Sequence, residues 1–211
     1  MALPIQTIVG GNAAATTGSL PVNVRVGNTG ELVVQNLHAD LYEAAARGNI
    51  YAGSNLAGTT TTVGFATTHT GLCLANPLGS GKNLVLLRVK YGAVVAQSAA
   101  LVFGLQTGYS AITNVVQTTP MVVGSNFAGN PAGVGLLAAA VTLPVAPTRL
   151  ILVDTIVTGA ITTRIMSGNQ YDFNGSVVIP PGGFAATYTS AASAASSLVF
   201  GFTWEEVSAT V

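Results

Sequence analysis

The feature of this sequence that most constrains its fold is a regular alternation between short β-rich runs and clusters of glycine, proline and asparagine. From Thr59 onward these runs recur at roughly 10- to 15-residue spacing. Segments of helical length and period do not alternate with them, as a parallel sheet built from βαβ units requires. The punctuation therefore predicts an all-β fold, an antiparallel sandwich or barrel.

Two segments carry this prediction most clearly. In NLVLLRVKYG, exposed Arg88 and Lys90 alternate with apolar residues that we expect to face a core, namely Leu84, Leu86, Val89 and Tyr91. In FGFTWEEV, three large aromatic residues fall at every second position, so they share one strand face and predict core packing: Phe200, Phe202 and Trp204. The corner VVIPPGG lies between strands, because proline is excluded from the middle of a sheet.

The chain divides, on this view, into two parts. Residues 1–30 are rich in Gly, Ala, Thr and Asn and predict an extended N-terminal arm leading into a first strand, with Val22, Val24 and Val26 on one face. Residues 31–211 form the β-sandwich domain, beginning with a strand over Glu31–Leu37. We expect at most one short helix, in HADLYEAAARGN at 38–49, or a single turn of helix between two strands. Residues 127–146 are either a long loop or a weakly specified strand pair.

The surface of this fold must be mostly neutral. Charged residues make up 7% of the chain and cancel to a net charge of zero, while hydrophobic residues stand at 49%. An ordinary soluble domain has about 25% charged residues. There is no long-range field to attract nucleic acid or an anionic membrane, so neither is expected as a partner. Near-zero charge favours association, which predicts a homo-oligomer or a component of a larger particle.

The beginning and the apolar runs of the sequence predict neither export nor membrane insertion. MALPIQTIVGG has no basic region followed by an apolar stretch of signal-peptide length. The longest apolar run, at 132–147, is shorter than the ~20 residues of a spanning helix, and Thr142 and Pro144 interrupt it. We therefore expect a protein made in the cytosol.

The stretch NPLGSGKNLVLL, at 76–87, has the appearance of a phosphate-binding loop. Such a loop needs a glycine five residues before the Gly-Lys pair and a hydroxyl residue after it, so that amides wrap the phosphates and the hydroxyl holds magnesium. Asn76 and Asn83 occupy these two positions. The residues that follow are strand-like rather than helical. We predict a reversal of the chain, with Lys82 solvated at the start of the next strand.

Two short polar stretches are candidates for a metal site. His38, Asp40 and Glu43 lie close in sequence, and two of them are three residues apart, a spacing that shares one helix face. Neither a zinc motif nor a Cys/His cluster accompanies them. The stretch GNQYDFNG offers Asn169, Asp172 and Asn174 for calcium but lacks the acidic density of an EF-hand. Both stretches favour ordinary surface groups, and we predict no metal and no cofactor.

Catalytic residues are also not indicated. The two histidines, His38 and His69, stand without the G-x-S-x-G elbow of a serine hydrolase. Cys73 lies between two leucines, so a buried, inert thiol is expected, and as the only cysteine it makes no intrachain disulfide. Glu205 and Glu206 are adjacent on the last strand and therefore face opposite ways. We predict no catalytic residue.

Three segments resemble a known class of proteins. The stretch NPLGSGKNLVLLRVKYG, the opening part ELVVQNLHADLYEAAARGNIYAGSN and the C-terminal VVIPPGGFAATYTSAASAASSLVFGFTWEEV are similar to segments of tailed-bacteriophage virion proteins. This resemblance implies a jelly-roll-like β-sandwich that acts as a structural component of a phage particle. Residues 115–146 carry no part of the resemblance.

The resemblance also sets the expected function. It implies a capsid decoration (cement) protein, located in the virion, that forms a homo-oligomer, a trimer being one candidate. The partner would be the major capsid protein or another virion protein, and the N-terminal arm is where we expect an intersubunit contact. The alternative is a receptor-binding or lectin-like module of a phage tail or head fibre, which would share the fold and differ in its site.

Overall fold

The computed structural model describes residues 40–95, 97, 99–156 and 169–209. The chain divides into two compact units, Met1–Tyr42 and Glu43–Val211, and the architecture below is that of the second. The predicted arm at 1–30 and the predicted strand at Glu31–Leu37 lie outside the described residues. The boundary of the sandwich domain at residue 31 stays a prediction.

The described residues contain one short helix followed by strands only. The helix α1 is Tyr42–Ala46, and the strands are β1 (Ile50–Ser54), β2 (Thr68–Ala75), β3 (Lys82–Ala93), β4 (Leu101–Tyr109), β5 (Val116–Pro120), β6 (Val123–Ser125), β7 (Leu136–Thr142), β8 (Arg149–Ile156), β9 (Asn169–Ile179), β10 (Gly183–Thr189) and β11 (Leu198–Ser208). The helix is shorter than the sequence 38–49 suggests. Residues 127–146, left open between a loop and strands, contain the strand β7.

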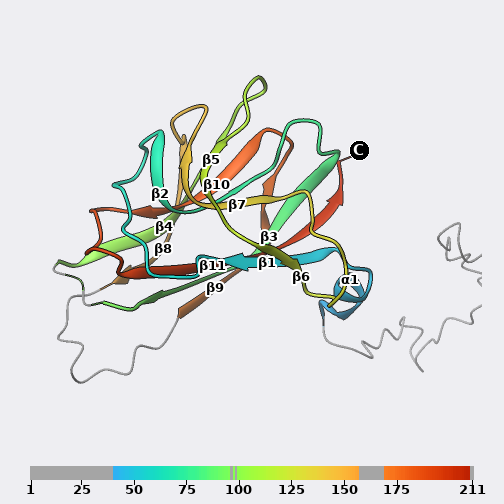
Figure 1. Cartoon of the computed structure of the whole chain (residues 1–211), viewed down its shortest axis with the longest axis horizontal. Coiled ribbons are helices and arrows are strands. Elements are labelled where there is room, and N and C mark those ends of the chain that lie inside the picture. The colour runs from blue at the N-terminus through green and yellow to red at the C-terminus, as the bar shows by residue number, and fades with distance from the viewer. Residues whose placement is uncertain (1–39, 96, 98, 157–168, 210–211) are drawn as a thin grey trace, which may run out of the picture. The chain divides into compact units, whose positions relative to one another are not determined.

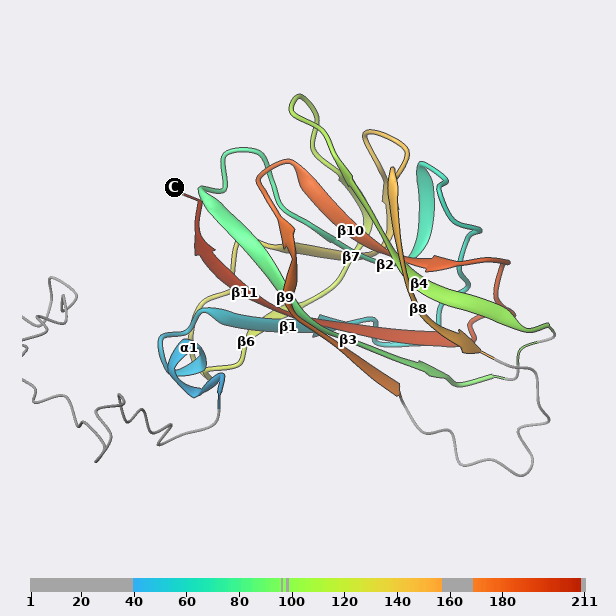
Figure 2. The ribbon, with the colours of Figure 1, turned by 180° about the vertical axis from the view of Figure 1, so that it is seen from behind.

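The strands form two antiparallel sheets that pack face to face as a sandwich (Figures 1 and 2). Sheet I has the order β6-β1-β11-β3-β9, and sheet II has the order β5-β7-β2-β10-β4-β8. This architecture confirms the all-β, antiparallel sandwich that the punctuation of the sequence predicts.

The pairing of the long strands is nested. The first strand pairs with the last, β1 with β11, and moving inward along the chain β2 pairs with β10, β3 with β9 and β4 with β8. These pairs alternate between sheet I and sheet II. The three remaining strands, β5, β6 and β7, are inserted between β4 and β8 and extend both sheets on the side of β1 and β2.

The core lies between the two sheets and is made by alternate residues of the strands. The aromatic face predicted for the last strand is its centre, because Phe200, Phe202 and Trp204 are all almost fully buried in it. The apolar residues predicted for β3 join them: Leu84, Leu86, Val89 and Tyr91. The alternation of β3 changes phase between Leu86 and Arg88, where its register with β9 shifts by a bulge. Arg88 and Lys90 then point away from the core.

The outer face of sheet II is covered by connections between strands. Residues 110–115 and 143–148 join strands from opposite sides of this sheet, so each must cross it. Val115 and Leu143 from these two connections pack on a second apolar cluster, whose sheet residues are mostly small: Cys73, Ala75, Ala138, Val141, Phe184 and Ala186. The alanines of β7 and β10 leave room for the chain that lies over them. The central strands β2 and β10 of sheet II are therefore buried on both faces, while β5 and β8 at its edges are largely exposed.

Candidate functional site

The NPLGSGK stretch is a turn between β2 and β3. Asn76, which stands where a phosphate loop has its first glycine, donates from Nδ2 to the carbonyl oxygens of Lys82 and Ile179 at 2.7 and 2.8 Å. Its backbone pairs with that of Gly182 and Gly183 in the neighbouring turn. Gly79 and Gly81 have φ of 77° and 66°, which explains the glycines. The predicted chain reversal is confirmed. Asn76 uses its Nδ2 and its backbone groups within the fold, while its Oδ1 is buried without a hydrogen-bond partner among the described residues.

His69 lies at the centre of a buried polar cluster on the outer side of sheet II. Its Nδ1 accepts hydrogen bonds from the Gln106 side-chain amide at 3.3 Å and from the Thr62 hydroxyl at 3.4 Å. Its Nε2 faces the Thr187 hydroxyl at 3.5 Å. Because burial removes the ring from water, it lowers the pKa of His69 to about 4. His69 is therefore a neutral structural residue. The other histidine, His38, lies outside the described residues.

The same cluster holds the connection between β1 and β2 against the sheet. The Gln106 amide oxygen accepts the backbone N–H of Phe65 at 2.7 Å, and its nitrogen also donates to the carbonyl of Thr187 at 3.1 Å. Phe65 has φ of 64°, a strained value for a bulky residue, and its ring meets the edge of Tyr188. The sequence did not indicate this cluster, because its members come from four separate segments.

The thiol and the inward carboxylate of the described core also have structural roles. Cys73 is fully buried, as expected, and burial raises the pKa of its thiol. Glu205 and Glu206 face opposite ways, as predicted. Glu206 turns inward and accepts hydrogen bonds from the backbone N–H groups of Val134 and Gly135 at 3.1 and 2.9 Å, and from the Trp204 indole at 3.3 Å. This carboxylate ties the inserted segment to the last strand.

The residues considered for calcium, Asn169, Asp172 and Asn174, lie on β9, and the first two are bound to protein groups. Asp172 forms an ion pair with Arg88, at 2.5 Å, and accepts from the Gln170 amide at 3.1 Å. The hydrogen bond from Arg88, then that from Gln170, lowers the pKa of Asp172. Asn169 donates to Asp154. Among the residues that the structure describes, no group of three or more His, Cys, Asp or Glu side chains could hold a metal ion.

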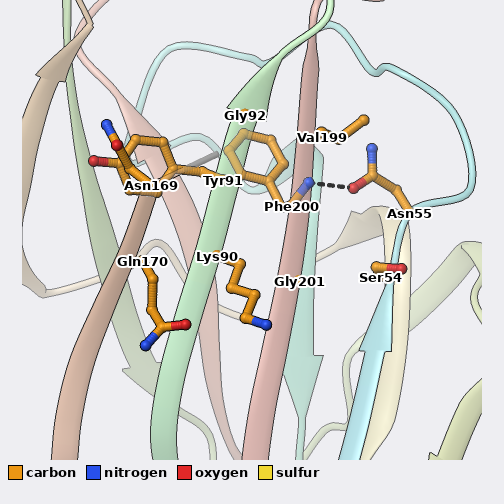
Figure 3. A pocket seen from close by; sticks show the side chains of 10 residues that line it. All are labelled: Ser54, Asn55, Lys90, Tyr91, Gly92, Asn169, Gln170, Val199, Phe200 and Gly201. Atoms are coloured by element: carbon orange, nitrogen blue, oxygen red, sulfur yellow. Dashed lines mark hydrogen bonds between the residues drawn. The ribbon is translucent and has the colours of Figure 1, made fainter. Parts of the chain in front are cut away.

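The outward face of sheet I carries a shallow depression of about 520 Å³ (Figure 3). One row of outward residues crosses it, because the strand registers place Ser54 opposite Gly201, Gly201 opposite Lys90, and Lys90 opposite Gln170. The next row contains the Arg88–Asp172 pair. The row comes from β1, β11, β3 and β9, which is why the sequence did not reveal it. The exposed phase of Arg88 and Lys90 was one visible signal.

Lys90 is the charged group of this depression. Its side chain is exposed, and within the described ranges no carboxylate lies at ion-pair distance from it. Figure 3 shows Lys90 and Ser54 on the two strands that flank Gly201, with Gln170 one strand beyond Lys90. Asn55, at the end of the depression, is fastened by its own bonds to the backbone of Phe200 and Leu198.

Comparisons with known proteins do not connect this chain to a family. A scan against protein-family models finds no match, and searches of the curated proteins and of the solved structures find none either. Within the part of the chain that is described, no helix is long and apolar enough to cross a membrane. The likeness to phage virion proteins therefore stays a prediction from the sequence.

Proposed function

We propose that this protein is a non-enzymatic structural component of a phage particle, most simply a capsid decoration protein that acts by self-association and docking on the capsid. The nested strand pairing carries the proposal. A ribbon in which first pairs with last, and second with second-last, rolled across two sheets, is the arrangement of a jelly roll, a fold common in viral capsid and lectin domains. We therefore interpret the eight strands of these four pairs as a jelly roll.

The use of the reactive side chains supports a structural role. His69, Cys73 and Glu206 are the groups from which a hydrolase or a redox enzyme would draw its chemistry, and all three are buried. His69 and Glu206 spend their hydrogen-bonding capacity on backbone and neutral side chains of the fold. Burial holds the first two in their uncharged forms at neutral pH. The burial of these three residues and the hydrogen bonds of His69 and Glu206 therefore stabilise the sandwich.

Exposed apolar side chains support self-association. Leu56, Ile112 and Val122 lie on connections between strands and are 86%, 89% and 77% exposed. On a surface with so little charge, such side chains lower the cost of bringing copies together. They fit a protein that buries part of its surface in a homo-oligomer and against the major capsid protein or another virion protein.

The test is the oligomeric state together with binding to particles. We expect light scattering of the purified chain to give a multiple of its 21.2 kDa mass at micromolar concentration, and we expect the chain to sediment with purified particles of a phage that encodes it. A reconstruction of those particles then locates the chain. A monomer that stays in the supernatant contradicts the proposal.

The second candidate, a receptor-binding or lectin-like module, is favoured by one observation, the open depression on sheet I. It shares the fold with the first candidate and differs in having a ligand.

A further inference from the structure

Gly201 is a glycine that the protein's own packing does not explain. It lies in the middle of β11, which is the central strand of sheet I. A glycine inside a strand costs stability relative to alanine, because it loses more backbone entropy and packs nothing. A Cβ added here would meet nothing closer than the Gly53 carbonyl oxygen and the Ser54 Cβ, both at 3.6 Å, which is ordinary contact. Its φ is not in the left-handed region either.

Three other strand glycines of this protein are explained by their neighbours, whereas Gly124, in the edge strand β6, has nothing within 4 Å. A Cβ on Gly53 would lie 2.5 Å from the Leu137 side chain, one on Gly104 would lie 2.6 Å from the Ile151 carbonyl, and one on Gly108 would lie 2.4 Å from the Phe184 ring. Each of these contacts is too close for any other residue. Gly201 differs because the space above it opens into solvent, at the floor of the depression. A glycine inside a strand marks a bulge, a tight bend, or the close approach of another backbone or a ligand. The register shift of β11 lies between Thr203 and Trp204 rather than at Gly201, and the open space over Gly201 leaves room for a ligand.

The rim of the depression gives the chemistry of that ligand. Lys90 supplies a positive charge, Ser54 a hydroxyl, and Gln170 an amide oxygen whose companion nitrogen is bound to Asp172. The carboxylate beside them, Asp172, forms an ion pair with Arg88, and its pKa is lowered first by the bonds from Arg88 and Gln170 and also by the charge of Lys90. Among the described residues, this row therefore presents one lysine without an ion-pair partner and several neutral hydrogen-bonding groups, which suits a hydroxylated ligand that carries one negative charge.

We propose that the outer face of sheet I around Gly201 binds an acidic saccharide, a sugar unit bearing a carboxylate. One face of the sugar unit lies against the Gly201 backbone, with its carboxylate held by Lys90 and a hydroxyl bonded to Ser54. Gln170, one strand beyond Lys90, bonds to the next unit of the chain. The depression of about 520 Å³ is within the size range of small-molecule sites, about 300–1,000 Å³. Its open form fits a unit of a chain that continues in both directions. This site adds a ligand to the proposed structural role and does not depend on it.

The test uses two acidic saccharides, sialyllactose and trigalacturonic acid, each paired with its methyl ester, in which the carboxylate charge is removed and the sugar units are unchanged. Each is titrated into the isotope-labelled full chain to about 10 mM, the range of weak saccharide binding, and followed by NMR. We expect saturable shifts for an acidic probe, centred on the amides of Ser54, Lys90, Gln170 and Gly201, with much weaker shifts for its neutral counterpart.

Two variants and one control sharpen the test. Gly201→Val fills the floor, so it should abolish binding while its melting temperature stays equal to or above that of the unmodified protein. Lys90→Gln removes the charge and should weaken acidic-probe binding by about tenfold or more. Lys82→Gln, at the other end of the same strand, should leave binding unchanged. If Gly201→Val fails to fold, the Lys90 and Lys82 variants still decide the matter.

Three outcomes overturn the proposal. The first is that neither acidic probe produces shifts at the stated concentration. The second is equal binding of the acidic and neutral probes, or equal loss with Lys82→Gln and Lys90→Gln, which would indicate attraction to charge in general. The third is a folded Gly201→Val variant that binds as the unmodified protein does.

Discussion

The outer faces of the two sheets differ in whether other parts of the chain cover them. Sheet II turns small and apolar residues outward and is covered by its own connections, which bury Cys73, Ala186 and Gln106 completely. Sheet I turns Arg88, Lys90 and Asp172 outward and leaves them half-buried or exposed. The glycines Gly104 and Gly108 of sheet II are explained by close atoms of the neighbouring strands, whereas Gly201 of sheet I is not. The comparison separates the face that stabilises the fold from the face available to a partner.

The largest expected difference between the two faces is in the free energy of unfolding, when one outward-pointing apolar residue on each sheet is truncated. Phe184 on sheet II is 1% exposed, while Val178 on sheet I is 52% exposed. We expect Phe184→Ala to lower the free energy of unfolding by about 3–5 kcal/mol, because it leaves a cavity beneath the crossing connections. Val178→Ala should change it by less than about 0.5 kcal/mol. Urea unfolding followed by tryptophan fluorescence measures both, and equal losses would contradict the covered-versus-open distinction.

The next largest expected difference is in the stability lost when a glutamine is truncated to alanine on each face. Gln106 makes hydrogen bonds to Phe65, Thr187 and His69 in the buried cluster. Gln106→Ala leaves these groups unsatisfied, so we expect a loss of about 3 kcal/mol. Gln170→Ala on the open face should cost less than about 0.5 kcal/mol. Increased proteolysis within residues 60–67 of the Gln106 variant would show that the β1–β2 connection is released, and unchanged protection would contradict its role as the fastening.

The pH dependence of stability should come from the covered face. Because the folded-state pKa of His69 is lowered to about 4 from 6.5, the unfolded chain takes up a proton first as the pH falls. Stability is therefore complete above about pH 6.5, declines below it, and has lost about 3 kcal/mol near pH 4 from this group. Unfolding free energies measured across this range test the slope.

A His69→Gln variant is the control for that measurement. It should start less stable at pH 7 and show a flatter dependence between pH 6.5 and 4. Asp172 on the open face has a lowered pKa, so its contribution is present above its unfolded pKa and is lost only as the pH falls through its folded value, in a more acidic range. An unchanged slope in the His69 variant would assign the pH dependence to other groups.

The strands and their core faces were predictable because both follow from the alternation of apolar and polar residues within one segment. The alternation in NLVLLRVKYG identified Leu84 and Tyr91 as inward, and the aromatic repeat did the same for Trp204. The short helix was located approximately, since α1 falls inside 38–49. Neither the nested pairing nor the crossing of sheet II was predictable, because these depend on which distant strands become neighbours.

The candidate site escaped prediction for the same reason. Ser54, Lys90, Gln170 and Gly201 belong to four strands, and only the registers bring them into one row. Buried His69 was considered as a catalytic residue because sequence does not record what surrounds a side chain. Besides the exposed phase of Arg88 and Lys90, the sequence holds a second local signal in Gly201 itself, a glycine at an outward position between two core phenylalanines. A strand of this kind calls for a β-branched or polar residue there.

The smallest predicted effect compares two glycines by adding one methyl group to each. Gly108→Ala places a Cβ 2.4 Å from the Phe184 ring on the covered face, so we expect a loss of about 1–3 kcal/mol. Gly201→Ala meets nothing closer than 3.6 Å, so removing the backbone entropy of glycine should raise the unfolding free energy by about 0.5–1 kcal/mol. Thermal unfolding of both variants tests whether the glycine of the covered face is required by its neighbours and the glycine of the open face is not. If Gly201→Ala were destabilising, its glycine would have a structural reason, and the inference that a ligand explains it would lose its main support.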